Sequence, residues 1–145
     1  MELGLNGKVA AITGGSEGIG LATALRLAAE GAVVGICARR QEPLEKAVAM
    51  IRDAGAADVI ALPLDMTRPG EPERFIAEVV KRFGRLDILV NNAGREAVGP
   101  FEDTDDTAWQ ADLDLKLFGA VRSIRAALPH MRNAGGGRII NITHV

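Results

Sequence analysis

Short apolar runs alternate along this chain with longer stretches in which apolar residues recur at the spacing of a helix. Five of the short runs are almost continuously apolar, which predicts strands that are buried on both faces of a sheet. These runs occupy residues 8–13, 32–38, 58–64, 86–90 and 138–142. The pattern therefore predicts that strands and helices follow one another throughout the chain.

The stretches between the predicted strands have the pattern of amphipathic helices. Two apolar stripes with helical spacing consist of Leu44, Ala47, Val48 and Ile51, and of Phe75, Ile76, Val79, Val80 and Phe83. Glycines at positions 31, 55 and 84 are expected to end helices, and Pro43 fits a first helical turn. The longest helix is predicted from near Asp105 to the glycine-rich segment 133–137, with Trp109 either in the core or on an oligomer interface.

Regular alternation of strand and helix predicts one α/β domain over residues 1–145, a Rossmann-like doubly wound parallel sheet with helices on both faces. In such sheets ligands bind at the carboxyl ends of the strands, so the loops that follow the strands are the expected functional segments. The apolar fifth strand would leave an uncovered edge, which proteins normally pair, cover or charge. We therefore expect the C-terminal part of the fold to lie outside these 145 residues.

Composition narrows the function classes. With 48% apolar residues and a net charge of −2, the chain can build a core, and its mixed charges lack the basic patch of a nucleic-acid-binding protein. No apolar run approaches the roughly 18 residues of a membrane span and no signal-peptide pattern opens the sequence, so we expect a cytoplasmic protein without a membrane partner. The single cysteine, Cys37, is expected to be a buried strand residue, and no metal-ligand motif is present.

The loop after the first predicted strand reads TGGSEGIG, residues 13–20, and leads directly into a helix. Glycines there let backbone N–H groups and the positive end of the helix dipole approach an anion, and phosphate is the expected ligand. The spacing Thr-Gly-x-x-x-Gly-x-Gly differs from the G-x-G-x-x-G fingerprint, and Leu21 stands where a Walker loop needs lysine. An ordinary tight connection between strand and helix is the alternative interpretation.

A second motif, NNAG at residues 91–94, directly follows the fourth predicted strand. With these two motifs the whole chain resembles the short-chain dehydrogenase/reductase family, whose members transfer hydride between nicotinamide and a carbonyl or alcohol carbon. The resemblance implies a cofactor held by the glycine loop, by the ends of the second and third strands, and by NNAG, with Asp65 at the adenine. The implied cofactor-binding residues are Thr13, Gly14, Gly15, Ser16, Glu17, Gly18, Ile19, Gly20, Ala38, Arg39, Arg40, Asp65, Met66, Asn91, Ala93 and Gly94.

The second predicted strand ends in CARR, residues 37–40, which bears on the choice between NAD and NADP. NAD-preferring enzymes usually carry an acidic residue there to hold the ribose hydroxyls, whereas an arginine receives the 2′-phosphate of NADP. Ala38 occupies the acidic position and Arg39 follows it, so the resemblance implies a preference for NADP, with NAD as the alternative. Two other interpretations stay open: Arg39 and Arg40 are a solvated pair, or Glu17, where NADP-preferring relatives often carry a basic residue, opposes the phosphate.

The family's acid/base group is a tyrosine in a Tyr-x-x-x-Lys helix, and these 145 residues contain no tyrosine. The chain by itself is therefore predicted to be inactive. Alignment on Trp109 and Gly119 places Lys116 where the family carries an asparagine that holds a water relay. Alignment on residues 138–142 places Thr143 and His144 at the family's two hydroxyl positions, the second of which is the catalytic serine. His144 is then either a donor to a substrate carbonyl or an incidental terminal residue, and Thr143 is the other candidate donor.

Two hypotheses about function follow from these observations. In the first, the chain is the cofactor-binding portion of an NADP-preferring oxidoreductase that acts on a small carbonyl or alcohol and forms a homodimer or homotetramer when complete. In the second, it is a non-catalytic nucleotide-binding fragment or regulatory module. The loop 95–101 would line the substrate entrance by resemblance, and its sequence leaves the substrate open.

Overall fold

The computed structural model describes residues 3–95 and 99–143. Its strands are β1 (Val9–Thr13), β2 (Val33–Ala38), β3 (Val59–Pro63), β4 (Ile88–Asn91) and β5 (Arg138–Asn141). They form one parallel sheet in the order β3-β2-β1-β4-β5, so each predicted strand is confirmed to within two residues. Because the order reverses between β3 and β4, the carboxyl ends of β1 and β4 lie side by side, which is where ligands bind in sheets of this kind.

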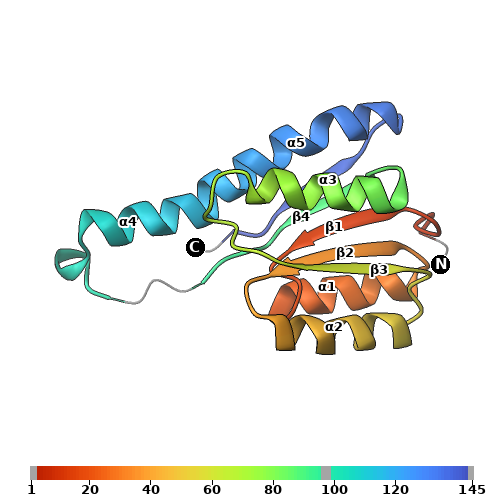
Figure 1. The fold of residues 1–145 in the computed structure, drawn as a ribbon, viewed down its shortest axis with the longest axis horizontal. Helices are drawn as coiled ribbons and strands as arrows, with labels where there is room; N and C mark the ends of the chain where they lie inside the picture. Colours follow the sequence, from red (N-terminus) through yellow and green to blue (C-terminus); the bar gives the residue numbers. More distant parts are fainter. Residues whose placement is uncertain (1–2, 96–98, 144–145) are drawn as a thin grey trace.

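Helices connect the strands and cover both faces of the sheet (Figure 1). α1 (Gly18–Ala29) and α2 (Gln41–Asp53) pack on one face, and α3 (Glu71–Phe83) and α5 (Gly119–Asn133) pack on the other. The doubly wound, Rossmann-like fold is thereby confirmed. None of the helices in residues 3–95 and 99–143 combines the length and the apolar character that crossing a membrane requires.

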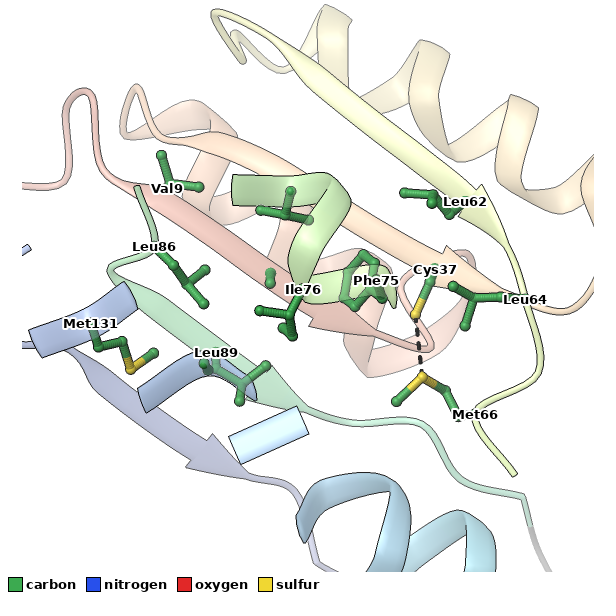
Figure 2. Packing of buried hydrophobic residues seen from close by; sticks show 13 residues of the cluster. Val9, Cys37, Leu62, Leu64, Met66, Phe75, Ile76, Leu86, Leu89 and Met131 are labelled. Carbon is green, nitrogen blue, oxygen red and sulfur yellow. Dashed lines mark hydrogen bonds between the residues drawn. The ribbon is translucent and has the colours of Figure 1, made fainter. Parts of the chain in front are cut away.

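Two apolar layers hold the helices on the sheet. Successive residues of β1 point to opposite faces, so Ile12 joins the layer under α1 and α2 while Val9 joins the layer under α3 and α5. Figure 2 shows the second layer, where Phe75 and Ile76 of α3, both fully buried, lie over the strands beside Leu89 of β4. Burial of one such side chain contributes about 1.5–3 kcal/mol. The strands are apolar at successive positions because both of their faces are covered.

The predicted long helix exists, but a wider turn interrupts it. α4 (Asp106–Leu113) passes through a π-helical turn (Asp114–Phe118) into α5. The i, i+4 spacing of Trp109, Leu113 and Leu117 fits both an α-helix and a π turn, so the pattern did not reveal the interruption. α4 reaches beyond the sheet in Figure 1, and Trp109 is 44% exposed. In the described part of the chain Trp109 is therefore not a core residue.

The prediction that residues 138–142 form a strand buried on both faces was wrong. β5 stands at the edge of the sheet, three of its four residues are exposed, and Ile140 is 46% exposed. The physical reason is position: β5 has a strand neighbour on its β4 side alone, within the residues that the structure describes. The uncovered edge that the sequence predicted is therefore present.

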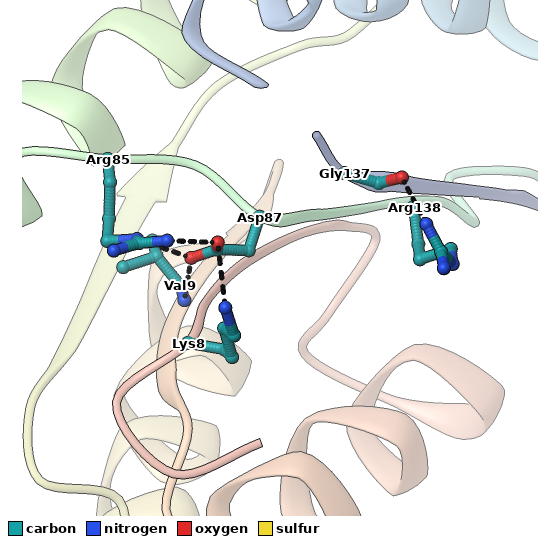
Figure 3. A network of polar contacts seen from close by, with 6 residues as sticks. All are labelled: Lys8, Val9, Arg85, Asp87, Gly137 and Arg138. Carbon is teal, nitrogen blue, oxygen red and sulfur yellow. Dashed lines mark hydrogen bonds and ion pairs between the residues drawn. The ribbon is translucent and has the colours of Figure 1, made fainter. Parts of the chain in front are cut away.

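A buried carboxylate ties together the amino ends of β1 and β4, at the opposite end of the sheet from the glycine loop (Figure 3). Asp87 is 6% exposed, and its side chain accepts hydrogen bonds from the Val9 N–H at 3.0 Å and from Arg85 at 2.7 and 2.8 Å. Burial raises the pKa of Asp87, but these donors and the nearby Lys8 outweigh it and hold the pKa below its usual range. The network fixes β1 against β4 and thereby the two loops that follow them.

Candidate functional site

Glycines close the loop between β1 and α1. A Cβ atom at Gly15 would lie 2.5 Å from Cγ2 of Ile36, and one at Gly20 would collide with the carbonyl oxygen of Gly14. Gly18 differs, because its φ is +57° and no atom lies within 4 Å of the Cβ position. The loop is therefore tightly packed on one side, while its backbone is open at the start of α1, an arrangement that suits an anion at a helix N-terminus.

Thr13 joins this loop to the one that follows β4. Its side chain is 2% exposed, and Oγ1 accepts hydrogen bonds from the backbone N–H groups of Asn92 and Ala93, both at 3.0 Å. The Asn92 side chain donates in return to the carbonyl oxygens of Thr13 at 3.1 Å and Gly14 at 3.0 Å. Sequence reasoning included Thr13 and Ala93 but missed Asn92, although an amide within NNAG, at the end of a buried strand, was the available signal.

The two loops border a cleft of about 600 Å³ at the carboxyl ends of the strands. Twelve of the sixteen predicted cofactor-binding residues line it: Gly14, Ser16, Glu17, Gly18, Ile19, Ala38, Arg39, Arg40, Asp65, Met66, Ala93 and Gly94. The lining residues that were not among the predicted cofactor-binding residues are Cys37, Leu64, Thr67, Asn92, Arg95, Ala111, Asp114 and Leu115, of which Arg95 belongs to the loop predicted at the substrate entrance. Ala111, Asp114 and Leu115 come from α4 and the π turn, whose approach to the cleft depends on tertiary packing.

The other four predicted residues lie outside the lining. Thr13, Gly15 and Gly20 pack within or beneath the loop and shape it. Asn91 is 8% exposed, and its Nδ2 donates to Oδ1 of Asn141 at 2.8 Å. Asn91 therefore links β4 to β5 and contributes to the sheet instead of the cleft wall.

Charged groups line the side of the cleft formed by the loops after β1, β2 and β3. Arg40 Nη2 donates to Glu17 Oε2 at 2.7 Å, which joins the loop after β2 to the glycine loop. Asp65 Oδ1 accepts from the backbone N–H of Thr67 at 2.9 Å and from its hydroxyl at 2.7 Å. Partial burial raises the pKa of Asp65, but the Thr67 hydrogen bonds and the charges of Arg39 and Arg68 hold it below its usual range. Asp65 is therefore a fixed negative charge at neutral pH.

The single cysteine lies under the cleft. Cys37 is fully buried, and its Sγ lies 3.8 Å from Sδ of Met66 (Figure 2). Burial raises the pKa of the Cys37 thiol to about 12, although a hydrogen bond with the Gly14 backbone acts in the opposite direction. At neutral pH the thiol is therefore protonated and unreactive, as predicted for a buried strand residue.

Of the three predicted catalytic residues, Lys116 and Thr143 lie in the described part of the chain, and neither of these two lines the cleft. Lys116 is exposed within the π turn, where its Nζ lies 3.0 Å from Oδ1 of Asp112, and it is not among the lining residues. Thr143 follows β5 and is exposed, while His144 lies outside the described residues. Among the residues described, no group of three or more His, Cys, Asp or Glu side chains is placed to hold a metal ion.

A doubly wound parallel sheet with a glycine-lined cleft at the switch point is typical of dinucleotide-binding proteins. Comparison with known families places the chain more closely, because the model of the short chain dehydrogenase family matches residues 8–145. The chain belongs to this family of oxidoreductases.

Individual relatives agree with this placement. The 11-beta-hydroxysteroid dehydrogenase 1A of Arabidopsis thaliana is 40% identical over 133 residues, which cover 91% of this chain and 38% of that protein. The crystal structure of L-sorbose reductase from Gluconobacter frateurii with NADPH and L-sorbose gives a TM-score of 0.92 at 38% identity, over 96% of this chain and 53% of that one. The NADH-dependent reductase A1-R′ with NAD gives 0.88 at 33% identity, over 96% and 60%. The chain therefore spans between about two-fifths and three-fifths of the length of these three relatives.

Proposed function

We propose that this chain is the nucleotide-binding part of an oxidoreductase that transfers hydride between the nicotinamide of NADP, or less readily NAD, and a small carbonyl or alcohol substrate. The main observation in support of the proposal is the contact made by Thr13, whose hydroxyl accepts hydrogen bonds from the NNAG segment and so holds this segment and the glycine loop at one cleft. Family membership supports the same function, as do the NADPH and NAD named with two similar structures.

The cleft residues fit a dinucleotide. The open backbone at Gly18 offers the N–H groups of the first turn of α1 to a pyrophosphate, and Asp65 offers a carboxylate to the amino group of an adenine. A cleft of about 600 Å³ is within the usual range for sites that enclose small ligands. When bound, the nicotinamide supplies the hydride donor or acceptor, and this chain's residues bind and orient it.

We further propose that Arg39 contacts the 2′-phosphate of NADP. Arg39 lines the cleft at the end of β2, and Ala38 before it offers no carboxylate to ribose hydroxyls. One charge-assisted hydrogen bond is worth about 1.5–3 kcal/mol, or roughly tenfold to a hundredfold in affinity. We expect Arg39→Asp to reverse the preference, measured as the ratio of the dissociation constants for NAD⁺ and NADP⁺. An unchanged ratio would remove Arg39 from the site.

For the chemistry, we propose that Thr143 or His144 donates a hydrogen bond to the substrate oxygen and that Lys116 stands at the relay position. A cation at position 116 already paired with Asp112 would serve a different relay from the asparagine of the family. The tyrosine and lysine of the family mechanism would come from sequence outside these 145 residues. On this proposal the 145 residues bind nucleotide without turnover, and the exposed stripe at Trp109 belongs to the oligomer interface of the complete protein.

The second candidate function is a nucleotide-binding module without catalysis. Lys116 favours it, since a lysine at this position departs from the tetrad of the family. Tight nucleotide binding without turnover, in a protein that carries a Tyr-x-x-x-Lys segment, would support this module over the oxidoreductase.

Binding is the first test. Titration of the purified chain with NADPH, followed by calorimetry, should show one site per chain. We expect Gly18→Ala to weaken binding about tenfold or more, because its Cβ enters the space at the start of α1. Gly84→Ala is the matched control: Gly84 also has a positive φ and open space, but it ends α3 away from the cleft. Each variant should lose about 1–2 kcal/mol of stability from the left-handed backbone. Lack of NADPH and NAD⁺ binding by the wild-type chain would overturn the proposed function.

A further inference from the structure

Glu17 and Arg40 form an ion pair between two separate elements at the cleft. Glu17 precedes α1 at its N-cap position, and Arg40 precedes α2 at the same position. Arg40 Nη2 lies 2.7 Å from Glu17 Oε2, and both residues line the cleft. The pair therefore crosses from the glycine loop to the end of β2, beside the place where a nucleotide's ribose would lie.

Arg39 and Arg40 differ in what surrounds their charges. Arg40 is engaged by Glu17, whereas no described carboxylate lies within ion-pair distance of Arg39. The charge of Arg39 helps to lower the pKa of Asp65, which lies in the loop after β3. A phosphate that entered this part of the cleft would thus meet one arginine without a close acidic partner and a second arginine already neutralised by Glu17.

We infer that Glu17 limits the preference of the cleft for a 2′-phosphate by holding Arg40 through this ion pair. The inference rests on the proposed function, since it concerns the nucleotide of that same cleft. Glu17 acts here through Arg40, so it is a specificity-determining residue by positioning another side chain. Arg40 is 70% exposed, which leaves it room to turn toward the nucleotide once the carboxylate is removed.

Removal of the Glu17 charge tests the inference directly. In Glu17→Gln the Arg40 guanidinium loses its ionic partner, so it can turn toward the nucleotide and join Arg39 at the phosphate. We expect the ratio of the dissociation constants for NAD⁺ and NADP⁺ to rise about two- to fivefold, which is the range that an exposed charge pair can supply. Affinity for NAD⁺ alone, which lacks the 2′-phosphate, should change less than about twofold.

A double-mutant cycle separates the ion pair from simple repulsion. If Glu17 acts by holding Arg40, then Glu17→Gln should leave the ratio nearly unchanged when Arg40→Gln is already present. If Glu17 merely repels the phosphate, the ratio should rise equally in both backgrounds, and that result would overturn the inference. Glu42→Gln is the matched control, because it removes the same charge from an exposed pair with Lys46 at 2.8 Å, on α2 but outside the cleft lining.

The outcomes also distinguish this inference from the proposed function. If the wild-type chain binds neither nucleotide, the proposed function fails. If it binds both and the ratio does not move in Glu17→Gln, or moves as much in Glu42→Gln, the inference fails while the proposed function stands. A rise that appears only in Glu17→Gln and only with Arg40 present supports both.

Discussion

The Thr13 hydroxyl is the contact on which the candidate site depends, and Thr13→Val tests it with almost no change of shape. Valine fills the same space, but it cannot accept the two hydrogen bonds from the backbone N–H groups of Asn92 and Ala93. Thr13→Ser is the matched control, since serine keeps the oxygen and loses one buried methyl group.

The magnitude follows from burial. A buried donor left without its acceptor costs about 1–3 kcal/mol, and we take about 1 kcal/mol for each N–H because Asn92 and Ala93 are half-buried and water reaches them in part. Thr13→Val should therefore lose about 2 kcal/mol in total, and Thr13→Ser about 1 kcal/mol for its missing methyl. The two variants differ mainly in where the loss falls, which is the loop after β4 in the first and the core in the second.

Amide hydrogen exchange locates the loss. In Thr13→Val the amides of Asn92 and Ala93 should exchange about thirtyfold faster than in the wild type, because about 2 kcal/mol of local protection is gone. In Thr13→Ser the same amides should stay protected relative to the rest of the sheet. We also expect nucleotide affinity to fall in Thr13→Val and to survive in Thr13→Ser. Equal protection of these two amides in both variants would refute the role assigned to the hydroxyl.

Two further predictions concern ionisable groups. Asp87→Asn should lower the free energy of unfolding at neutral pH by about 1–3 kcal/mol, whereas Asp58→Asn, whose partner Arg82 is more than half exposed, should cost less than about 1 kcal/mol. The pKa of Asp87 is lower in the folded than in the unfolded state, so the extra stability of the wild type is complete above the unfolded-state pKa near 4 and disappears as the pH falls through the folded-state pKa. Urea unfolding at several pH values measures this difference in stability, and a difference that does not change with pH would contradict the prediction. Cys37, with a pKa of about 12, should not react with a thiol reagent at neutral pH until urea unfolds the chain. Equally fast reaction of the native protein would show that the thiol is accessible.

The sheet could be predicted from the sequence because both faces of its central strands are covered, which makes β1, β2 and β4 almost continuously apolar. The same signal misled at residues 138–142. Apolar character reports what a strand can bury, and the burial of β5 depends on a neighbour that the described chain does not provide. An edge strand and a central strand can therefore carry the same local pattern.

The candidate site could be predicted where its residues belong to one short sequence motif. The glycine loop carries its own conformational requirements, so the residues from Gly14 to Ile19 that line the cleft could be named in advance. Asp114 and Leu115 could not be named in advance. They reach the cleft from a π turn, and the spacing of apolar residues in the sequence does not distinguish this turn from an α-helix. Asn92 lies between these cases. Its motif was recognised in the sequence, but the hydrogen bonds of its side chain to the glycine loop could be seen only in the structure.

The arrangement of the candidate residues separates nucleotide binding from chemistry. The groups proposed to bind nucleotide lie on loops after β1 to β4, and contacts of Thr13, Asn92 and the Glu17–Arg40 pair join the loops after β1, β2 and β4 to one another. Two groups proposed for catalysis lie in the described part of the chain, and both are at the margin, with Thr143 exposed beyond an edge strand and Lys116 exposed in a wider turn. Local stability follows the density of buried contacts, so the first set should keep its geometry under conditions that loosen the second. It follows that variants at Lys116 and Thr143 should leave nucleotide affinity within about twofold of the wild type, and a larger loss would mean that binding and catalysis share one cooperative unit.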